Sequence, residues 1–194
     1  MALKVYLQKN NCNIIEGYSR SCYKETIILQ MLCSDNSIKN ILEIGFNAGH
    51  SSDLFLDNNQ GCSVISFDIG EHSYVKVAKE YIDKTYPNRH TLIIGDSTKT
   101  IPNYKTDIKY DLIFIDGGHL YEVAKADLLN CKKLSHKDTI VIMDDTINKK
   151  DWEREYTIGP TRAWNEGIKS GLITQISSLD FEPGRGMSWG KYNI

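Results

Sequence analysis

Three aspartates stand directly after two apolar segments of the chain. Asp116 follows residues 110–115, and Asp144 and Asp145 follow residues 139–143, 28 and 29 positions beyond Asp116. If the two segments are neighbouring parallel strands, their carboxyl ends meet at the edge of the sheet where open α/β proteins bind ligands. Carboxylate oxygens are ligands that Mg²⁺ and Mn²⁺ accept. The spacing therefore predicts that Asp116, Asp144 and Asp145 converge and hold a divalent cation.

A histidine, His119, follows Asp116 by three residues. An imidazole at that place could take the proton of a hydroxyl group. Three carboxylates that converge without a cation would repel one another and raise a pKa. Simpler roles exist as well, because acids after strands often cap the next helix and a single histidine is more often a hydrogen-bonded surface residue. A cation site and a metal-free site with His119 as the base both stay open.

A glycine-rich turn follows the first apolar segment, Asn40–Ile44. It reads Gly45-x-x-x-Gly49, with Glu43 two residues before the first glycine. Glycine allows a sharp turn and lets a ligand approach the backbone without a Cβ in the way. Dinucleotide sites favour G-x-G-x-x-G, but here Asn47 stands where a middle glycine would be. The turn therefore favours a nucleoside cofactor whose tail is an amino acid attached to a sulfonium, rather than a diphosphate.

Acidic residues also end the next two apolar segments. Asp68 follows the second segment, and its two carboxylate oxygens could accept both hydroxyls of a ribose. Asp96 and Ser97 follow the third, where Asp96 could accept from an adenine amino group. Each of these acids alone could equally be a helix N-cap. Their order at successive strand ends is what favours a nucleoside-cofactor site.

The elements that must position these residues are visible in the hydrophobic periodicity. Five short apolar segments are typical of strands buried on both faces, and helical patterns separate them. The predicted strands are Asn40–Ile44, 63–67, 91–94, 111–115 and 139–143, and the predicted helices are 49–57, 72–85 and 119–134. This alternation predicts an open, mostly parallel α/β sheet.

The two ends of the chain add further elements. A helix is predicted over residues 16–33, and another over 160–168, with Pro160 in its first turn. Residues 172–177 and 186–192 are predicted to form an antiparallel edge pair around a turn at 180–185. The chain is thus expected to be one domain, with an N-terminal helical region (1–37), a cofactor-binding core (38–146), a lid loop (147–159), and a helix with closing strands (160–194).

Composition excludes several function classes. The net charge is −2, so no basic surplus favours nucleic-acid binding. The five cysteines form no C-x-x-C pair, which indicates free thiols in a reducing, cytoplasmic compartment rather than disulfides or zinc. No apolar stretch is long enough for a membrane span or a signal peptide. Exposed edges of the tail strands could pair between chains, which leaves a homo-oligomer open.

The quoted motifs resemble those of the class I S-adenosylmethionine-dependent methyltransferases, in particular the methyltransferase-domain-24 group. The matching stretches are Ile-Leu-Glu-Ile-Gly-Phe-Asn-Ala-Gly-His-Ser (41–51), Ser-Phe-Asp-Ile-Gly (66–70), Gly-Asp-Ser (95–97), Phe-Ile-Asp-Gly-Gly-His-Leu-Tyr-Glu (114–122) and Val-Ile-Met-Asp-Asp (141–145). The resemblance implies a Rossmann-like, doubly wound, seven-stranded sheet with one antiparallel strand near the C-terminus. It also implies that S-adenosylmethionine contacts Glu43, Gly45, Phe46, Asn47, Gly49, Ser51, Asp68, Ile69, Asp96, Ser97 and Asp116.

The resemblance extends to metal-dependent O-methyltransferases of catechols and sugars. It implies that Mg²⁺ or Mn²⁺ binds Asp116, Asp144 and Asp145. The chain departs from these relatives at Gly118, because they commonly read Asp-Gly-Asp-His where this chain reads Asp-Gly-Gly-His. The proton-abstracting role of the missing acid would pass to His119 or to the metal.

We therefore expect an O-methyltransferase that acts on a hydroxyl of a small molecule or a sugar or glycan, with catalytic roles for His119 and Asp116. The nearest alternative is a metal-independent enzyme with His119 as base. Two rivals belong to other classes. A nicotinamide-dependent dehydrogenase is disfavoured by the glycine spacing, and a catalytically silent cofactor-binding scaffold is favoured only by the acid missing at Gly118.

Overall fold

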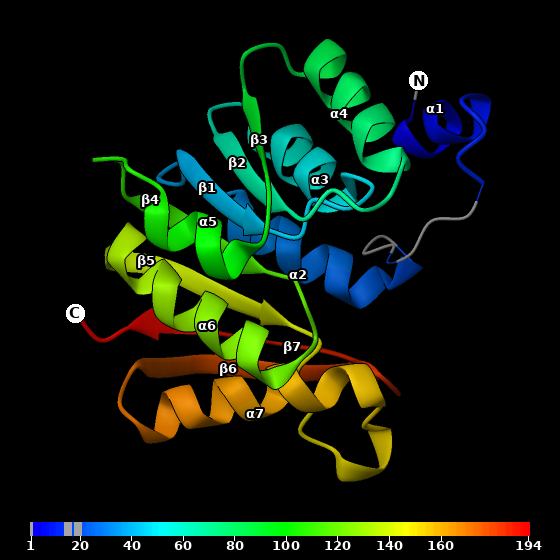
Figure 1. Ribbon diagram of the computed structural model, residues 1–194. Coiled ribbons are helices and arrows are strands. Elements are labelled where there is room, and N and C mark those ends of the chain that lie inside the picture. The colour runs from blue at the N-terminus through cyan, green and yellow to red at the C-terminus, as the bar shows by residue number, and fades with distance from the viewer. Residues whose placement is uncertain (1, 14–16, 18–20) are drawn as a thin grey trace.

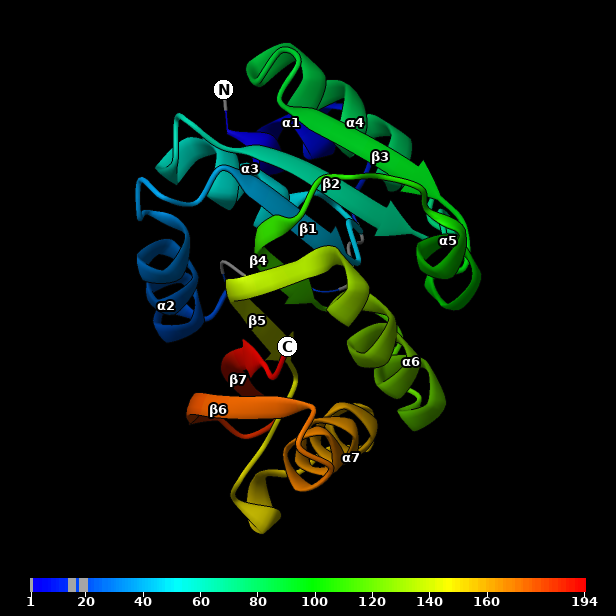
Figure 2. The ribbon, with the colours of Figure 1, turned by 90° about the vertical axis from the view of Figure 1, so that its left-hand side faces the viewer.

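A computed structural model describes residues 2–13, 17 and 21–194. Its centre is a seven-stranded sheet of order β3-β2-β1-β4-β5-β7-β6 (Figures 1 and 2). The strands are β1 (Asn40–Ile44), β2 (Ser63–Asp68), β3 (His90–Ile94), β4 (Tyr110–Ile115), β5 (Ser135–Asp144), β6 (Ile173–Glu182) and β7 (Arg185–Tyr192). The helices are α1 (Leu3–Lys9), α2 (Tyr23–Cys33), α3 (His50–Asn58), α4 (Tyr74–Thr85), α5 (Ser97–Asn103), α6 (Tyr121–Cys131) and α7 (Glu155–Lys169), with 3₁₀ turns at Lys132–Leu134 and Lys150–Trp152.

Strands β1 to β5 are parallel, and β7 alone runs antiparallel to both of its neighbours. The predicted fold class is confirmed, including the single antiparallel strand. The register places the strand ends side by side: Ile44 pairs with Ile115, and Ile115 pairs with Met143. Since Asp116 and Asp144 directly follow these paired residues, the register itself brings the predicted acids to one edge of the sheet.

Each face of the sheet carries its own apolar core, because both faces of the parallel strands are covered by helices (Figure 2). One core joins α1 to α4 with alternate strand residues such as Ile41 and Leu112. The other joins α5, α6 and α7 with the intervening residues, such as Leu42 and Ile113. This alternation is the reason that the strands read as continuous apolar segments. None of the described helices is both long and apolar enough to cross a membrane.

Two predicted boundaries near the C-terminus were wrong. Helix α7 begins at Glu155 rather than near Pro160, because the backbone N–H of Arg154 donates to Thr157 Oγ1 and an additional turn forms before the proline. Strand β6 continues to Glu182, so the turn is shorter than predicted. Register irregularities interrupt the pairing of β6 with β7 at two places, and these break the two-residue alternation that would have revealed the full strand.

The N-terminal helical region also differs from the prediction. The structure places α2 at Tyr23–Cys33 and adds the short helix α1, which packs against α4. Residues 16 and 18–20 of the predicted helix lie outside the described residues.

The segment predicted as a lid, 147–159, is tied to its surroundings. The Asp180 carboxylate accepts hydrogen bonds from the backbone N–H groups of Asn148 and Lys149, each at 2.9 Å. Ile147 is buried, and its N–H donates to Thr161 Oγ1 at 2.9 Å. The last residues of the segment belong to α7. A lid movement of this segment stays a prediction.

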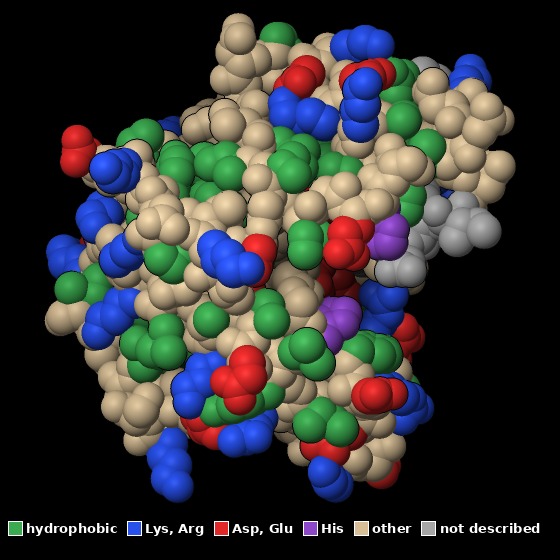
Figure 3. Space-filling model, viewed as in Figure 1, with side chains coloured by type: hydrophobic (Ala, Val, Ile, Leu, Met, Phe, Trp, Pro, Cys, Tyr) green, Lys and Arg blue, Asp and Glu red, His purple; other side chains and the backbone are tan. Residues whose placement is uncertain are grey.

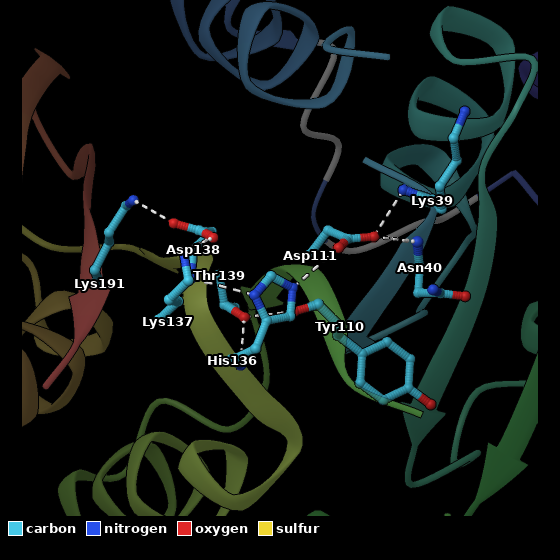
Figure 4. A network of polar contacts seen from close by, with 9 residues as sticks. All are labelled: Lys39, Asn40, Tyr110, Asp111, His136, Lys137, Asp138, Thr139 and Lys191. Carbon is cyan, nitrogen blue, oxygen red and sulfur yellow. Dashed lines mark hydrogen bonds and ion pairs between the residues drawn. The ribbon is translucent and has the colours of Figure 1, made fainter. Parts of the chain in front are cut away.

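A polar network connects the amino ends of β1, β4 and β5, at the end of the strands opposite the predicted acids (Figure 4). Asp111 accepts backbone N–H groups from Lys39 and Asn40 at 2.8 Å each, and His136 Nε2 lies 3.0 Å from its other oxygen. Thr139 Oγ1 donates to the carbonyl of Tyr110 at 2.6 Å. These contacts span the irregular pairing of β4 with β5 and hold the register on which the alignment of the acids depends.

Candidate active site at the carboxyl ends of the strands

A cavity of about 680 Å³ opens at the carboxyl ends of the parallel strands. Figure 3 shows acidic and histidine side chains gathered around this hollow. Its lining is formed by the carboxyl ends of β1, β2 and β5, by the turns after β1 to β5, by helices α2, α3, α5, α6 and α7, by β7 and by Gly17. The lining residues are Gly17, Glu25, Ile44, Gly45, Phe46, Asn47, Ala48, His50, Ser51, Phe67, Asp68, Ile69, His72, Gly95, Asp96, Ser97, Asp116, Gly117, Gly118, His119, Val123, Asp144, Asp145, Tyr156 and Arg185. A cavity at this edge is where open α/β sheets bind ligands.

The turn after β1 can form only with glycine at its first position. Gly45 has φ +94°, and a Cβ there would lie 1.9 Å from the carbonyl oxygen of Asp116. Its N–H donates to the carbonyl of Phe67 at 2.8 Å. The glycine therefore lets the β1 turn lie directly against the turn after β4, so that the predicted cofactor loop and the predicted acids share one wall of the cavity.

Glu43 lies beneath this turn instead of in the cavity. It is fully buried, and its carboxylate accepts hydrogen bonds from Ser51, from Ser52 at 2.5 Å and from Ser66 at 2.5 Å. Burial raises the pKa of Glu43, and the three serine hydroxyls act in the opposite direction. Glu43 thus braces Ser51, which does line the cavity.

The predicted ribose-binding acid, Asp68, lines the cavity beside the turn after β1. One of its oxygens accepts the N–H of Asn47 and the other accepts the N–H of Gly70, both at 2.7 Å. Asn47 has a left-handed backbone, φ +49°, which points its N–H at this carboxylate. Each carboxylate oxygen can accept a second hydrogen bond. Asp68 therefore joins two turns and keeps acceptor capacity for a diol.

The next acid, Asp96, serves as a helix cap and also lines the cavity. Its side chain accepts from the N–H of Thr98 at 3.0 Å and from the Thr98 hydroxyl at 2.6 Å, and Lys99 Nζ lies 2.9 Å away. The Thr98 hydroxyl and then Lys99 lower the pKa of Asp96 to about 2. The N-cap interpretation is therefore confirmed for this residue. Ser97 lies beside it in the lining.

Three side chains from the turns after β4 and β5 form a compact group of ligand type. One ligand atom from each of Asp116, His119 and Asp145 lies within 4.8 Å of the other two. Nε2 of His119 is 3.0 Å from Asp145 Oδ2, and this contact raises the pKa of His119. Asp145 has a left-handed backbone, φ +56°, at the end of its strand. The sequence placed all three residues at this edge but did not foresee that the histidine completes the group.

Asp144 lines the same cavity but lies outside the group of three. Burial raises the pKa of Asp144 well above its usual range, and the Glu25 and Asp116 carboxylates add to the effect. The pKa of Asp116 is also raised, mainly by burial and then by the Asp145 carboxylate. Crowded carboxyl groups of this kind favour a proton or a cation among them.

Several lining residues gave no signal in the sequence. Glu25 from α2 and Arg185 from β7 form an ion pair at 3.1 Å across 160 positions of the chain. Tyr156 of α7 lies beside His119, with ring centroids 5.7 Å apart. Neighbours of the glycine turn, such as His50, could have been found from their position, whereas Glu25, Tyr156 and Arg185 stand in no motif.

Comparisons with known proteins identify the family and the fold of the chain. The family model Methyltransf_24, described as a methyltransferase domain, matches residues 42–146. Among solved structures, the chain is similar to an O-methyltransferase from Bacillus cereus in complex with SAH, with 21% identity over 97% of this chain and 90% of that one and a TM-score of 0.78. It is also similar to the O-methyltransferase TomG from Streptomyces achromogenes, involved in tomaymycin synthesis and bound to SAM, with 15% identity over 99% and 88% and a TM-score of 0.76.

A third similar structure is cofactor-bound Rv0187 from MTB, with 16% identity, coverage of 98% and 88%, and a TM-score of 0.80. At these identities the solved structures establish the fold. A search of curated protein sequences finds no match.

Proposed function

Because the chain belongs to the Methyltransf_24 family and is an S-adenosylmethionine-dependent methyltransferase, we propose that it methylates a hydroxyl group of a small molecule, a sugar or a glycan. We further propose that a divalent cation, Mg²⁺ or Mn²⁺, orients the acceptor. The observation that carries the proposal is the contact between the glycine turn, where the cofactor is expected, and the residues expected to hold the cation. The turn after β1, at Gly45, lies against the carbonyl of Asp116, whose side chain belongs to the cation-type group.

We place the cofactor along the tips of β1 to β3. In this arrangement the amino-acid tail lies over the turn from Gly45 to Ser51, Asp68 accepts from the ribose hydroxyls, and Asp96 lies near the adenine. Ile69 lines the cavity with a side chain that is 57% accessible, so it would offer an apolar surface to the purine ring. Supporting this placement, Asp68 and Asp96 both line the cavity although each is already fixed by backbone N–H groups.

The donor set fits a divalent cation. Octahedral ligands about 2.1 Å from a metal lie about 3 Å apart when adjacent, and His119 Nε2 and Asp145 Oδ2 are 3.0 Å apart. Asp116 would supply a further oxygen, and Asp144 lies alongside for a water-mediated or direct contact. Such a cation, when bound, would orient two neighbouring hydroxyls and lower the pKa of the one to be methylated.

The remaining work of the residues is to position the acceptor and to take its proton. Methyl transfer from a sulfonium is an in-line displacement, so the acceptor oxygen must be aligned behind the methyl group. His119 is half-exposed toward the cavity and is hydrogen-bonded to Asp145. In the metal-free alternative, His119 accepts the hydroxyl proton and Asp145 stabilises the resulting imidazolium. Gly118 supplies no acid. The hydroxyl proton would therefore pass to His119, or to water when a bound cation lowers the pKa of the hydroxyl.

Calorimetry separates the cation-dependent enzyme from the metal-free one. We expect S-adenosylhomocysteine to bind the wild type, and Mn²⁺ to bind the resulting complex. Asp145→Ala should weaken Mn²⁺ binding at least tenfold and leave S-adenosylhomocysteine binding within about threefold, since each lost charged ligand is worth over 1.4 kcal/mol. Asp144→Ala is the matched neighbour, and a smaller loss there would assign the inner ligand set to Asp116, His119 and Asp145.

The outcomes discriminate between the candidate functions. Absence of Mn²⁺ binding in the wild type, together with turnover of labelled methyl groups, would favour the metal-free mechanism. Cofactor binding with no labelled product from any catechol, sugar or glycan would instead favour the silent scaffold.

A further inference from the structure

The cavity divides into two halves of different chemistry. One half, which we call the cofactor half, is lined by the tips of β2 and β3 and includes Phe67, Asp68 and Ile69. The other, the acceptor half, is lined by Glu25, Asp116, Asp144, Asp145, His119, Tyr156 and Arg185. The acceptor half therefore combines side chains from α2, α7 and the β6–β7 hairpin with those at the ends of β4 and β5.

Charge in the acceptor half is strongly one-sided. Four carboxyl groups line it, and in the described lining Arg185 is the only side chain with a permanent positive charge. Arg185 is already engaged, since its Nη1 lies 3.1 Å from Glu25 and its Nε lies 3.5 Å from Glu182. A ligand that enters this half thus meets acids, and the one guanidinium that could attract an anion is paired.

Glu25 has an unused hydrogen-bonding position. Only 2% of the residue is exposed, and Oε2 is occupied by Arg185. Its other oxygen, Oε1, is buried without a hydrogen-bond partner among the described residues. A buried acceptor without a partner costs roughly 1–3 kcal/mol, so Oε1 favours any ligand that brings a hydroxyl or ammonium donor to it.

We propose that Glu25 is an acceptor-binding residue, held by Arg185, and that the acceptor half takes neutral or cationic hydroxyl compounds and rejects anionic ones. This inference rests on the proposed function and narrows its substrate class. Glu25 accepts a donor of the substrate that is separate from the methylated hydroxyl. Even with the proposed divalent cation bound, the four carboxylates outweigh the combined positive charge of that cation and Arg185. A carboxylate or phosphate on the same molecule is therefore disfavoured, because like charges in a partly dry cavity are weakly screened.

Two matched trios of probes test the charge preference. The catechol trio is dopamine, 4-ethylcatechol and 3-(3,4-dihydroxyphenyl)propionate, which share a two-carbon tail and differ mainly in its charge. The sugar trio is glucosamine, glucose and glucuronate. Labelled-methyl transfer from S-adenosylmethionine is measured with Mg²⁺ for all six, and binding of each to the complex with S-adenosylhomocysteine and Mg²⁺ is measured by calorimetry.

In at least one trio we expect the cationic and neutral members to exceed the anionic member at least tenfold in kcat/KM or affinity. Glu25→Gln should reduce the cationic-to-anionic ratio at least fivefold and should raise KM more than it lowers kcat. Glu182→Gln is the control, because it removes an acid that contacts the same arginine but lies outside the cavity lining. Glu182→Gln should leave the cationic-to-anionic ratio within twofold of the wild-type value. Cofactor affinity and melting temperature verify that both variants are folded.

If an anionic probe matches its cationic counterpart in kcat/KM and in affinity, the proposal is overturned, and no variant is needed to show this. An unchanged ratio in folded Glu25→Gln overturns the role of that residue. Failure of all six probes to bind or react, while S-adenosylhomocysteine still binds, also overturns the inference but leaves cofactor-dependent methyl transfer standing. Loss of cofactor binding by the wild type would instead refute the proposed function.

Discussion

Asp127→Asn should change the pH dependence of stability. Asp127 of α6 is completely buried, and neither carboxylate oxygen has a formed hydrogen bond with a described residue. Burial raises the pKa of this carboxyl from 3.8 to about 7, although the nearby Ser97 hydroxyl lowers it somewhat. It also lies behind the cavity wall, since a Cβ on Gly117 would be 3.3 Å from Asp127 Oδ2.

The sign follows from linkage. A carboxyl whose pKa is higher in the folded state keeps the protein most stable below pH 3.8, and that stability is lost as the pH rises through about 7. The difference between these two pKa values corresponds to about 4 kcal/mol. Integrating the same two pKa values, about 2.5 kcal/mol of this loss falls between pH 5 and pH 8.

Asparagine keeps the shape of the side chain and cannot ionise. Urea unfolding of wild type and Asp127→Asn at pH 5 and pH 8 isolates the effect, because the other buried acids are common to both proteins. We expect the free energy of unfolding of the variant, relative to that of the wild type, to be about 2–3 kcal/mol higher at pH 8 than at pH 5. Any constant cost of the amide cancels in this comparison. A stability difference that does not change with pH would refute the reasoning, as would a change of opposite sign.

The remaining predictions concern the turns around the cavity. Gly45→Ala should abolish binding of S-adenosylhomocysteine in calorimetry, because its Cβ would lie 1.9 Å from the Asp116 carbonyl at φ +94°; retained affinity would contradict the close approach of the two turns. Asp68→Ala should weaken the same ligand at least tenfold, since the carboxylate both fixes Asn47 and faces the proposed ribose; a change below twofold would displace the ribose from this acid. Ser66→Ala should destabilise the fold by about 1–2 kcal/mol in urea unfolding, because it removes the hydroxyl between Glu43 and His90, and an unchanged midpoint would show that the buried network is unimportant.

The strand tips were the part of the site that local pattern could predict. Apolar segments separated by helical patterns predicted parallel strands, and parallel strands put their carboxyl ends on one edge. Asp68, Asp96 and Asp116 were therefore placed correctly along the cavity. The boundaries at Glu155 and Glu182 were missed because a side-chain cap and strand irregularities leave no clear period in the sequence.

The hydrophobic pattern and the motifs could not predict the direction in which each side chain points. Glu43 stands in the motif where a ligand contact was expected, yet its carboxylate turns into the core toward three serines. Of the adjacent Asp144 and Asp145, it is Asp145, with its left-handed backbone, that joins His119. Consecutive residues at the end of a strand point in different directions, so only the folded backbone decides which of the two completes the group.

The amino-acid sequence by itself determined the sheet, the glycine turn and the edge at which the acids gather, because these depend on local periodicity and on the geometry of parallel strands. Tertiary structure alone decided the chemistry of the acceptor half, where Glu25 and Arg185 meet from elements 160 positions apart. That pairing depends on how α2 and the β6–β7 hairpin pack against the central strands. Packing of distant elements leaves no periodic trace in a single sequence.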